Sequence, residues 1–503
     1  MIKKNLQQSQ QDRFRLKSSP EYSQANFTWV VSLALALVLL LNSFAWGSLE
    51  VRPVILVLFI LYTLFTLGQG ALTYQIRRDL TRHGEIRPAT RRWGYAGLLS
   101  LLTGNVFLTV ASFNLIKKQK SPEYTISVYM LLTQIFVIAL SSLNMFKPYV
   151  SNGFLPGMGI LIAVTVFHLT ALLLVAKYAH QHVLPAGLKW LALPLLLTAA
   201  TGNLFAVVLG LSLLSKIRRS ANPGATRWAD VWIKITSNHT AMLGMFFIIF
   251  LFTISVSSLL TFEYSFAVDN NYSAILQSPS LTYPLGTDDF GRCLYSRIVF
   301  GARISLIVGF MSTLIPVIIG GILGAISGYY GRHTDNIIMR ALDILYAIPG
   351  ILLAIAIIAA FGANTFNLII ALSVGAIPTY ARTMRANVLM VSTYEYVDAA
   401  RAFGSSHLSI IFKHIVPNSL APMIVKTTLT IGGAVIATSS LSYLGLGVEP
   451  HIPEWGNILK IGSTYLETNS YLAIYPGLAI IALVLSFNFL GDGLRDALDP
   501  KLD

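Results

Sequence analysis

The sequence predicts an all-α polytopic membrane protein with about twelve transmembrane helices. Hydrophobic residues make up 54% of the 503 residues, and charged residues make up only 12%, which is about half the charged share of soluble domains. The apolar residues form continuous runs of about 20, the length that a helix needs to cross the hydrocarbon of a bilayer. A soluble enzyme is therefore excluded.

Twelve apolar runs are predicted as spans. They lie near residues 27–47, 53–73, 95–115, 127–146, 155–176, 190–214, 241–261, 303–329, 344–361, 365–380, 419–440 and 473–490. The run at 365–380 is the shortest and contains Pro378. The first run is too long for a cleavable signal peptide and lacks a small-residue cleavage pattern, so it is expected to remain as a span.

The distribution of Lys and Arg predicts the orientation, because these residues are concentrated on the cytoplasmic side of membrane proteins. Five basic residues lie in the tail 1–26, six in 74–93 and five in 215–240. We expect these segments and both termini to be cytoplasmic. Three lysines would then lie outside, against the rule: Lys117, Lys118 and Lys120. The net charge of +14 is attributed to topology and attraction to membrane lipid, not to nucleic-acid binding.

The first half contains a candidate internal repeat. Thr103-Gly104-Asn105 near the third predicted span matches Thr201-Gly202-Asn203 near the sixth. The match suggests that the six-helix extension 27–219 consists of two three-span units. Units with an odd number of spans would have opposite orientations, which gives a 3+3 inverted repeat. The alternative is chance similarity between two apolar segments.

The chain lacks the usual means of driving transport itself. The dipeptide Gly-Lys never occurs, so there is no Walker loop for ATP. No Asp or Glu lies in a predicted span, and His168 and Lys426 are the basic residues that lie away from the span ends. We expect no cofactor or metal bound by this chain, and energy for any uphill transport would have to come from a partner.

A polar segment between the tenth and eleventh predicted spans contains two predicted short helices. The first passes through Asp398, and Gly404 is expected to end it in the left-handed conformation. The second extends from Ser405 to Ile415 and is expected to stop at Pro417. Its apolar residues share one helix face: Leu408, Ile411, Phe412 and Ile415. Such a face requires a cover, either a groove on a partner or the bilayer surface.

This segment resembles the EAA loop of ABC-importer permeases. Asp398-Ala399-Ala400 is followed after three residues by Gly404 and then by Val416-Pro417, with Asp in place of the family's Glu. Blocks at 283–306, 343–357, 441–459 and 488–502 are similar, in the same order, to the second permease subunit of dipeptide and oligopeptide importers. The resemblance covers about 228–503. Within it, Tyr283, Cys293 and Tyr295 replace the usual His, Asp and aliphatic residues.

The resemblance implies a six-span permease domain at 241–503, preceded by a cytoplasmic linker and amphipathic segment at 220–240. It implies that the loop 395–417 couples to ATPase subunits. The partners it implies are a second homologous permease, two cytoplasmic ATPases that bind ATP and Mg, and an extracytoplasmic peptide-binding protein. The coupling residues carried over are Glu395, Asp398, Ala399, Ala400, Arg401, Gly404, Leu408, Ile411, Phe412, Ile415 and Pro417.

Two further sets of residues are candidates for structural or functional roles. The outer-loop motif comprises Gly286, Thr287, Asp288, Asp289, Gly291 and Arg292. It is expected either to close the loop through an Arg292–Asp pair or to contact a substrate-delivery protein. Gly320, Gly324 and Gly328 are spaced by four, which suits close helix packing, either within the chain or with the paired permease.

The expected function is that of a cell-membrane permease subunit that forms half the pathway for dipeptides or oligopeptides. The alternatives are nickel chelates, glutathione or another small solute as cargo, or a non-transporting scaffold or receptor. The extension 1–227 lies outside the resemblance. It is a lateral scaffold, a docking module or a separate transport or sensing unit, and its lack of mid-span Asp, Glu, Lys and Arg favours the scaffold.

Overall fold

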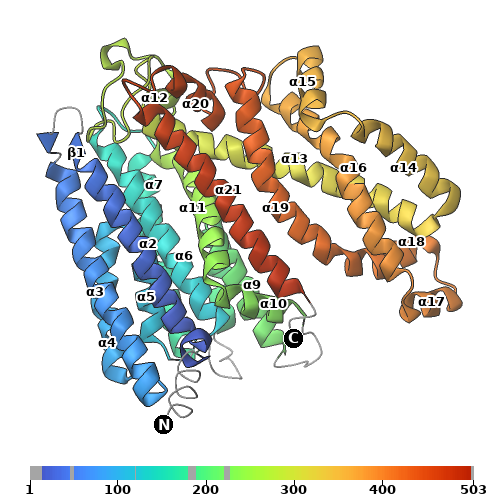
Figure 1. Cartoon of the computed structure of the whole chain (residues 1–503), viewed down its shortest axis with the longest axis horizontal. Coiled ribbons are helices and arrows are strands. Elements are labelled where there is room, and N and C mark those ends of the chain that lie inside the picture. Colours follow the sequence, from blue (N-terminus) through green and yellow to red (C-terminus); the bar gives the residue numbers. More distant parts are fainter. Residues whose placement is uncertain are drawn as a thin grey trace, which may run out of the picture. The chain divides into compact units, whose positions relative to one another are not determined.

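A computed structural model describes residues 14–45, 50–51, 53–118, 120–178, 188–219 and 227–499. The described part is almost entirely helical, apart from a two-stranded pair of β1 (Phe44–Ala45) and β2 (Glu50–Val51) (Figure 1). The predicted all-α class is confirmed. Residues 1–13 of the predicted basic tail and 220–226 of the predicted linker lie outside the described residues.

The chain divides into two compact units. Unit 1 comprises residues 1–132, 166–196 and 205–225, and unit 2 comprises 133–165, 197–204 and 226–503. Parts of the predicted extension therefore belong to the same unit as the segment that resembles permeases.

The first half of the chain contains four long helices and two pairs of short ones. The long helices are α2 (Pro20–Asn42), α3 (Pro53–His83), α6 (Pro122–Ser142), which continues into η2 (Leu143–Phe146), and α7 (Phe154–Tyr178). The first short pair is α4 (Pro88–Gly97) with η1 (Leu98–Thr103), followed by α5 (Val106–Ile116). The second is α8 (Lys189–Thr198) with η4 (Ala199–Thr201), followed by α9 (Leu204–Arg219).

The segments 95–115 and 190–214 each form a helix pair instead of the single span predicted for them. The chain turns at Gly104 (φ +71°) and at Gly202 (φ +90°). The two helices of the first pair are antiparallel, because Ser100 Oγ lies 3.0 Å from Thr109 Oγ1. A Cβ atom built on Gly97 would overlap Ser112 Oγ, and one built on Gly210 would lie 3.3 Å from the carbonyl oxygen of Ala192, so the second helix of each pair runs back along the first. Each pair therefore returns the chain to the side from which it started.

The repeat is visible in the structure, but the inverted arrangement predicted for it is wrong. Asn105 accepts a hydrogen bond from Leu108 N (3.0 Å) and donates one to Ser32 of α2 (2.9 Å). Asn203 occupies the matching place and donates to Gln134 of α6 (3.4 Å). Each half consists of two long helices and one short pair. The two long helices of each half cross the membrane in opposite directions, and the short pair returns to the side where it began. Each half therefore begins and ends on the same side, so the two halves have the same orientation.

The first helix pair also removes the conflict in the distribution of lysines. Lys118 forms an ion pair with Glu85 (2.8 Å), and Lys120 forms one with Glu21 at the start of α2 (3.4 Å). These lysines therefore lie at the same end of unit 1 as the first turn of α2. Their predicted position on the opposite side is wrong, because the run 95–115 does not cross the membrane.

The remaining helices belong to unit 2. They are α10 (Arg227–Ser237), α11 (His239–Thr261), α12 (Ser265–Val268), η5 (Tyr272–Ala274), α13 (Leu294–Tyr330), α14 (Arg332–Tyr346), α15 (Gly350–Phe361), α16 (Thr365–Val391), α17 (Glu395–Ala402), α18 (His407–Ser409), η6 (Ile410–Ile415), α19 (Val416–Tyr443), α20 (Trp455–Thr464) and α21 (Tyr471–Leu498). In the described part of the chain, eight helices are long and apolar enough to cross a membrane. The number is nine if α14 and α15, which meet at a 79° bend, count as one span.

Helix α13 packs along α16 through the three predicted packing glycines. A Cβ atom built on Gly320 would lie 2.7 Å from the carbonyl oxygen of Ile377, and one on Gly328 would lie 2.9 Å from that of Arg385. A Cβ on Gly324 would overlap the carbonyl oxygen of Ala381. All three glycines therefore serve a contact within the chain, because any larger residue would force the two helices apart.

Candidate functional site

The loop between α16 and α19 is built around a left-handed turn at Gly404. Its φ angle is +76°, as expected from the sequence. Gly404 N donates to Arg401 O (2.9 Å), and Ser405 N donates to Ala400 O (3.1 Å). This pair of bonds is the Schellman arrangement, which satisfies the last carbonyl groups of α17. The turn fixes the direction in which the chain leaves α17.

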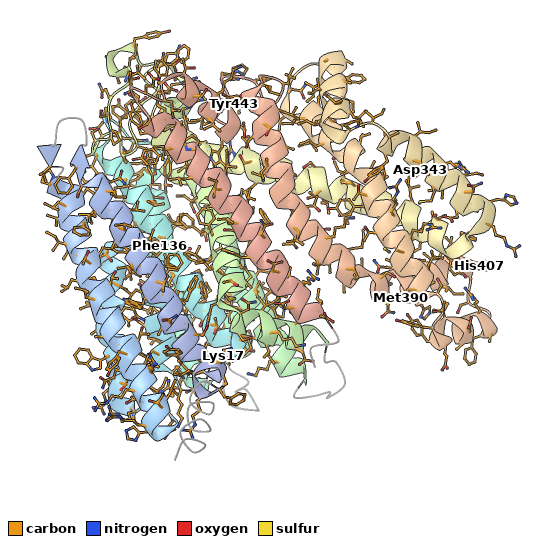
Figure 2. The ribbon with its side chains drawn as sticks, viewed as in Figure 1. Lys17, Phe136, Asp343, Met390, His407 and Tyr443 are labelled. Atoms are coloured by element: carbon orange, nitrogen blue, oxygen red, sulfur yellow. The ribbon has the colours of Figure 1, made fainter. Side chains whose placement is uncertain are left out.

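The second helix of the loop does not end at Pro417, so that prediction is wrong. α18, one π-helical turn (η6) and α19 form a single continuous helix, His407–Tyr443. Pro417 lies in the first turn of α19, where the missing N–H of a proline is tolerated. Figure 2 shows His407 and Tyr443 at the two ends of this helix.

The apolar residues of the loop divide between a buried set and an exposed set. Ile411 and Ile415 are fully buried and pack in one core with Val397 of α17 and with residues of α16. Leu408 and Phe412 are 61% and 49% exposed. The single apolar face predicted for the second helix is therefore split, because half of it covers α16.

The largest exposed side chain of the loop is one that the sequence analysis did not single out. Phe403, next to the turn at Gly404, is 88% exposed. It lies between the two predicted helices and so belongs to no periodic pattern. The available signal was a large aromatic residue beside a left-handed glycine in a polar segment. Together with Leu408 and Phe412 it forms the exposed apolar set of the loop.

The loop also contacts the end of α13. His407 Nδ1 lies 2.8 Å from the hydroxyl of Tyr329, and the guanidinium of Arg401 lies 5.4 Å from the centre of the Tyr329 ring. Arg401 also forms an exposed ion pair with Asp398 (3.0 Å). Among the other predicted coupling residues, Ala400 is buried, and the exposed ones are Glu395, Ala399, Gly404 and Pro417. A displacement of the loop would therefore act on α13, α16 and α19 together.

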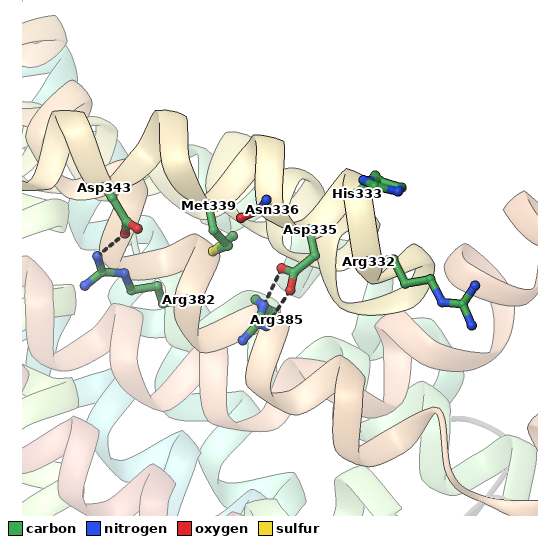
Figure 3. Close-up of a pocket in the computed structure, with 8 residues that line it drawn as sticks. All are labelled: Arg332, His333, Asp335, Asn336, Met339, Asp343, Arg382 and Arg385. Atoms are coloured by element: carbon green, nitrogen blue, oxygen red, sulfur yellow. Dashed lines mark hydrogen bonds and ion pairs between the residues drawn. The ribbon is translucent and has the colours of Figure 1, made fainter.

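A charged cavity of about 860 Å³ lies between α14 and α16 (Figure 3). Arg385 binds both carboxylate oxygens of Asp335, each at 2.6 Å. Arg382 binds Asp343 at 2.6 Å and lies over the ring of Tyr346. No sequence pattern pointed to these residues, because α14 lies largely between two predicted spans. The cavity presents paired charges of both signs, which suits contact with a polar solute.

The outer-loop motif forms a closed turn around a buried carboxylate. Asp288 accepts from the backbone N–H groups of Phe290 (3.0 Å) and Arg292 (2.9 Å) and from Arg292 Nε (2.8 Å). Arg297 Nε lies 3.6 Å from the same carboxylate. Asp288 is therefore the partner of Arg292. Asp289 is only partly buried, and burial together with the neighbouring Asp288 raises its pKa.

The rest of the motif shapes this turn. Gly286 and Gly291 have positive φ angles of +84° and +72°. A Cβ atom on Gly291 would overlap the backbone of Asn271. Thr287 is fully buried and accepts a hydrogen bond from Gln277 N (2.8 Å). These residues thus hold the turn closed.

Comparison with known proteins decides the family. A model described as "Binding-protein-dependent transport system inner membrane component" matches residues 320–503, and one described as "N-terminal TM domain of oligopeptide transport permease C" matches residues 226–279. The glutathione transport system permease protein GsiD of Pectobacterium atrosepticum is 40% identical over 277 residues, which cover 55% of this chain and 92% of that protein. The chain belongs to the ABC importer permease family.

Other relatives of this permease differ in the substrate named. The dipeptide transport system permease protein DppC of Alkalihalophilus pseudofirmus is 42% identical over 275 residues, covering 55% of this chain and 90% of that protein. A solved inward-facing structure of the MetNI methionine ABC transporter matches 40% of this chain and 97% of its own, with 21% identity and a TM-score of 0.34.

As an ABC importer permease, the chain is a multi-pass inner-membrane component. In the part of the chain that the structure describes, no three or more His, Cys, Asp and Glu side chains are grouped so as to hold a metal ion.

Within unit 2, the permease is joined to part of the extension through a buried lysine. Lys147 follows η2, and its ammonium group lies 4.6 Å from the ring centre of Phe266 and 5.9 Å from that of Tyr295. It donates to Ser296 Oγ (2.5 Å), and the hydroxyl of Tyr295 donates to Leu140 O (2.8 Å). Burial lowers the pKa of Lys147, while the Cys293 side chain opposes that shift. No sequence pattern indicated this contact, because only the fold brings these segments together.

The three departures from the family pattern lie at this junction. Tyr283, Cys293 and Tyr295 are buried in one core together with Val137 of α6 and Leu161 of α7. The residues that are unusual for the family are therefore those that pack against the segment 133–165.

Proposed function

We propose that this permease is one of two membrane subunits of an ATP-driven importer of short peptides or glutathione, and that it forms half of the translocation pathway. The named substrates of its relatives support this range of cargo. The observation that carries the proposal is the division of the apolar residues in the loop 395–417. Some of their side chains are exposed, and the others are buried in a core with residues of α16.

The exposed apolar set of this loop is the proposed contact with an ATPase subunit. Phe403, Leu408 and Phe412 would enter a groove on the ATPase, as an amphipathic helix does in a protein groove. The buried residues Ile411 and Ile415 would transmit the displacement to α16. The contact between His407 and Tyr329 would transmit it to α13. ATP and Mg would be bound by two such ATPases, and this chain would contribute no group to hydrolysis.

The residues of α14 and α16 that line the charged cavity are proposed to form part of the pathway wall, near the loop 395–417. Its ion pairs hold four charged side chains in place, including Asp335 and Arg385. A second, homologous permease would supply the opposite wall. The gating movement requires contacts that differ between the outward-facing and inward-facing states.

The proposed orientation places the loop 395–417 and both termini in the cytoplasm. The distribution of Lys and Arg supports this orientation. Lys118 and Lys120 form ion pairs with Glu85 and Glu21, which lie in the basic segments 74–93 and 1–26, so these basic residues share one end of unit 1. The turn at 286–292 would then face outward, toward an extracytoplasmic binding protein.

The extension is proposed to be a scaffold for the outer end of the permease. The support is the buried contact of Lys147 and the core that α6 and α7 share with α11 and α13 in unit 2. Deleting residues 1–220 should abolish assembly of the importer, because it uncovers this core. Truncating only residues 1–13 is the control. Normal uptake after the long deletion would exclude the scaffold role.

Site-specific cross-linking tests the coupling proposal. The single native cysteine, Cys293, is buried, so a cysteine introduced at Phe412 is the accessible thiol on the full chain. We expect Phe412→Cys, in the complex with its ATPases, to form an ATPase adduct. Leu281→Cys is the control, because Leu281 is 70% exposed and lies in the outer loop. An ATPase adduct at Leu281, or none at Phe412, would contradict the proposal.

A further inference from the structure

A second cavity, of about 730 Å³, lies beside the outer-loop turn in unit 2. It is bounded by the chain after α12, by the turn at 286–292 and by α20. Charged side chains of both signs line it: Arg292 and Lys460, and Asp269 and Asp289. Its volume is within the range of small-molecule sites. The turn at 286–292 therefore forms one wall of this cavity.

Arg292 has a donor without an acceptor at this wall. The residue is 5% exposed. Its Nε is bound by Asp288, and its guanidinium lies 4.6 Å from the centre of the Phe290 ring. Its Nη2 is buried and has no hydrogen-bond partner among the described residues. A buried, unpaired guanidinium N–H is costly, and the positive charge of Arg292 at this wall attracts a carboxylate bound in the cavity.

Asp289 presents the opposite charge at the same wall. Its Oδ1 is buried, with no hydrogen bond from the described part of the chain. The adjacent Asp288 is occupied by Arg292 and by two backbone N–H groups, so the two carboxylates have different tasks. An ammonium group in the cavity would pair with Asp289, and Asp269 on the same wall would add to the attraction.

We propose that this cavity receives a small zwitterion, with its carboxylate on Arg292 and Lys460 and its ammonium group on Asp289 and Asp269. Short peptides and glutathione share this chemistry, since each carries a free ammonium and a free carboxylate. The inference rests on the proposed function and makes it more specific. It places recognition of both charged groups at the outer entrance of the permease, before the solute reaches the pathway.

Saturation-transfer NMR on the full chain in nanodiscs tests the site with defined probes. The probes are alanyl-alanine, glutathione and N-acetyl-alanyl-alanine amide, which has neither charged group. We expect transfer to at least one of the two zwitterions and none to the capped peptide. Competition between alanyl-alanine and glutathione shows which of the two the site prefers.

Variants identify the site. Asp289→Asn and Lys460→Gln should each weaken binding of the zwitterion about tenfold, the effect of losing roughly 1.4 kcal/mol. Glu467→Gln removes a charge from an exposed residue that does not line this cavity and should leave binding unchanged. Equal transfer to the capped peptide, or wild-type affinity in both cavity variants, would overturn the inference.

Uptake by the complete importer separates this inference from the proposed function. ATP-dependent uptake of peptide by the wild type, combined with no charge-dependent binding in the cavity, would overturn the cavity site alone. Absence of ATP-dependent uptake of both peptide and glutathione would overturn the proposed function.

Discussion

Two short loops of unit 2 are built on opposite plans. In the outer turn at 286–292, the carboxylate of Asp288 is buried and has several donors. In the loop 395–417, the ion pair of Asp398 with Arg401 is exposed, and Phe403 lies almost entirely in solvent. The Asp288 carboxylate completes its hydrogen bonds within the chain, whereas the inner loop leaves apolar surface uncovered. The comparison indicates that the first supports the fold and that the second requires a partner.

The largest effect should come from removing the buried carboxylate of the outer turn. Asp288→Ala leaves Arg292 and Arg297 buried without their charge partner, so we expect a loss of about 3–5 kcal/mol in unfolding free energy. Asp398→Ala is the matched control, and its exposed ion pair is worth at most about 1 kcal/mol. Thermal unfolding of the two variants in the same detergent measures the difference. Similar destabilisation of both would break the comparison.

The next effect should come from the turn at Gly404. A Cβ atom there meets no atom within 4 Å, so Gly404→Val is strained only through its positive φ. The left-handed conformation costs a residue with a Cβ atom about 1–2 kcal/mol, so the valine should change the direction in which the loop leaves α17. We expect the complex to assemble and hydrolyse ATP while uptake falls about tenfold.

The conservative variant Gly404→Asn separates the backbone effect from the loss of glycine itself. Asn tolerates the left-handed conformation and should restore most of the uptake. Full uptake in Gly404→Val would remove the coupling role from this turn.

A smaller effect is expected at the exposed apolar set. Phe412→Ser should lower the unfolding temperature only modestly, because Phe412 is about half exposed, but it should weaken ATPase binding about tenfold, or 1.4 kcal/mol. Ile411→Ala is the contrasting variant, since Ile411 is fully buried and its truncation should cost about 2–5 kcal/mol of stability. Pull-down of the ATPases and thermal unfolding, measured on both variants, distinguish contact from packing.

The smallest effect is a dependence of stability on pH at Asp289. Its pKa is raised by burial and by Asp288, so the folded state favours the protonated carboxyl. The resulting stabilisation is present below the ordinary pKa of Asp and is lost as the pH rises through the raised value. Asp289→Asn should remove this dependence, with a difference below about 1 kcal/mol in unfolding experiments from pH 3 to pH 7. Parallel curves for the wild type and the variant would contradict it.

The sequence predicted the membrane class, the family and the left-handed turn at Gly404, because each depends on local composition or on residues close together in the chain. It misjudged the runs 95–115 and 190–214. An apolar run of about 20 residues has the same hydropathy whether it crosses the membrane or folds back halfway. Gly104 and Gly202 marked the turns, but a glycine in an apolar segment equally suits close helix packing.

The loop 395–417 shows the same division between what local sequence predicts and what only the fold decides. Helical spacing placed Ile411 and Phe412 on one predicted face, and the structure buries the first and exposes the second.

The sequence by itself determined that the chain lies in a membrane, which family it belongs to and where its loops carry charge. Only the tertiary structure decided which partner Asp288 serves, how Lys147 is enclosed and which halves of an apolar face remain exposed. Local sequence fixes hydropathy and backbone preference, whereas these outcomes depend on contacts between segments that lie far apart in the chain.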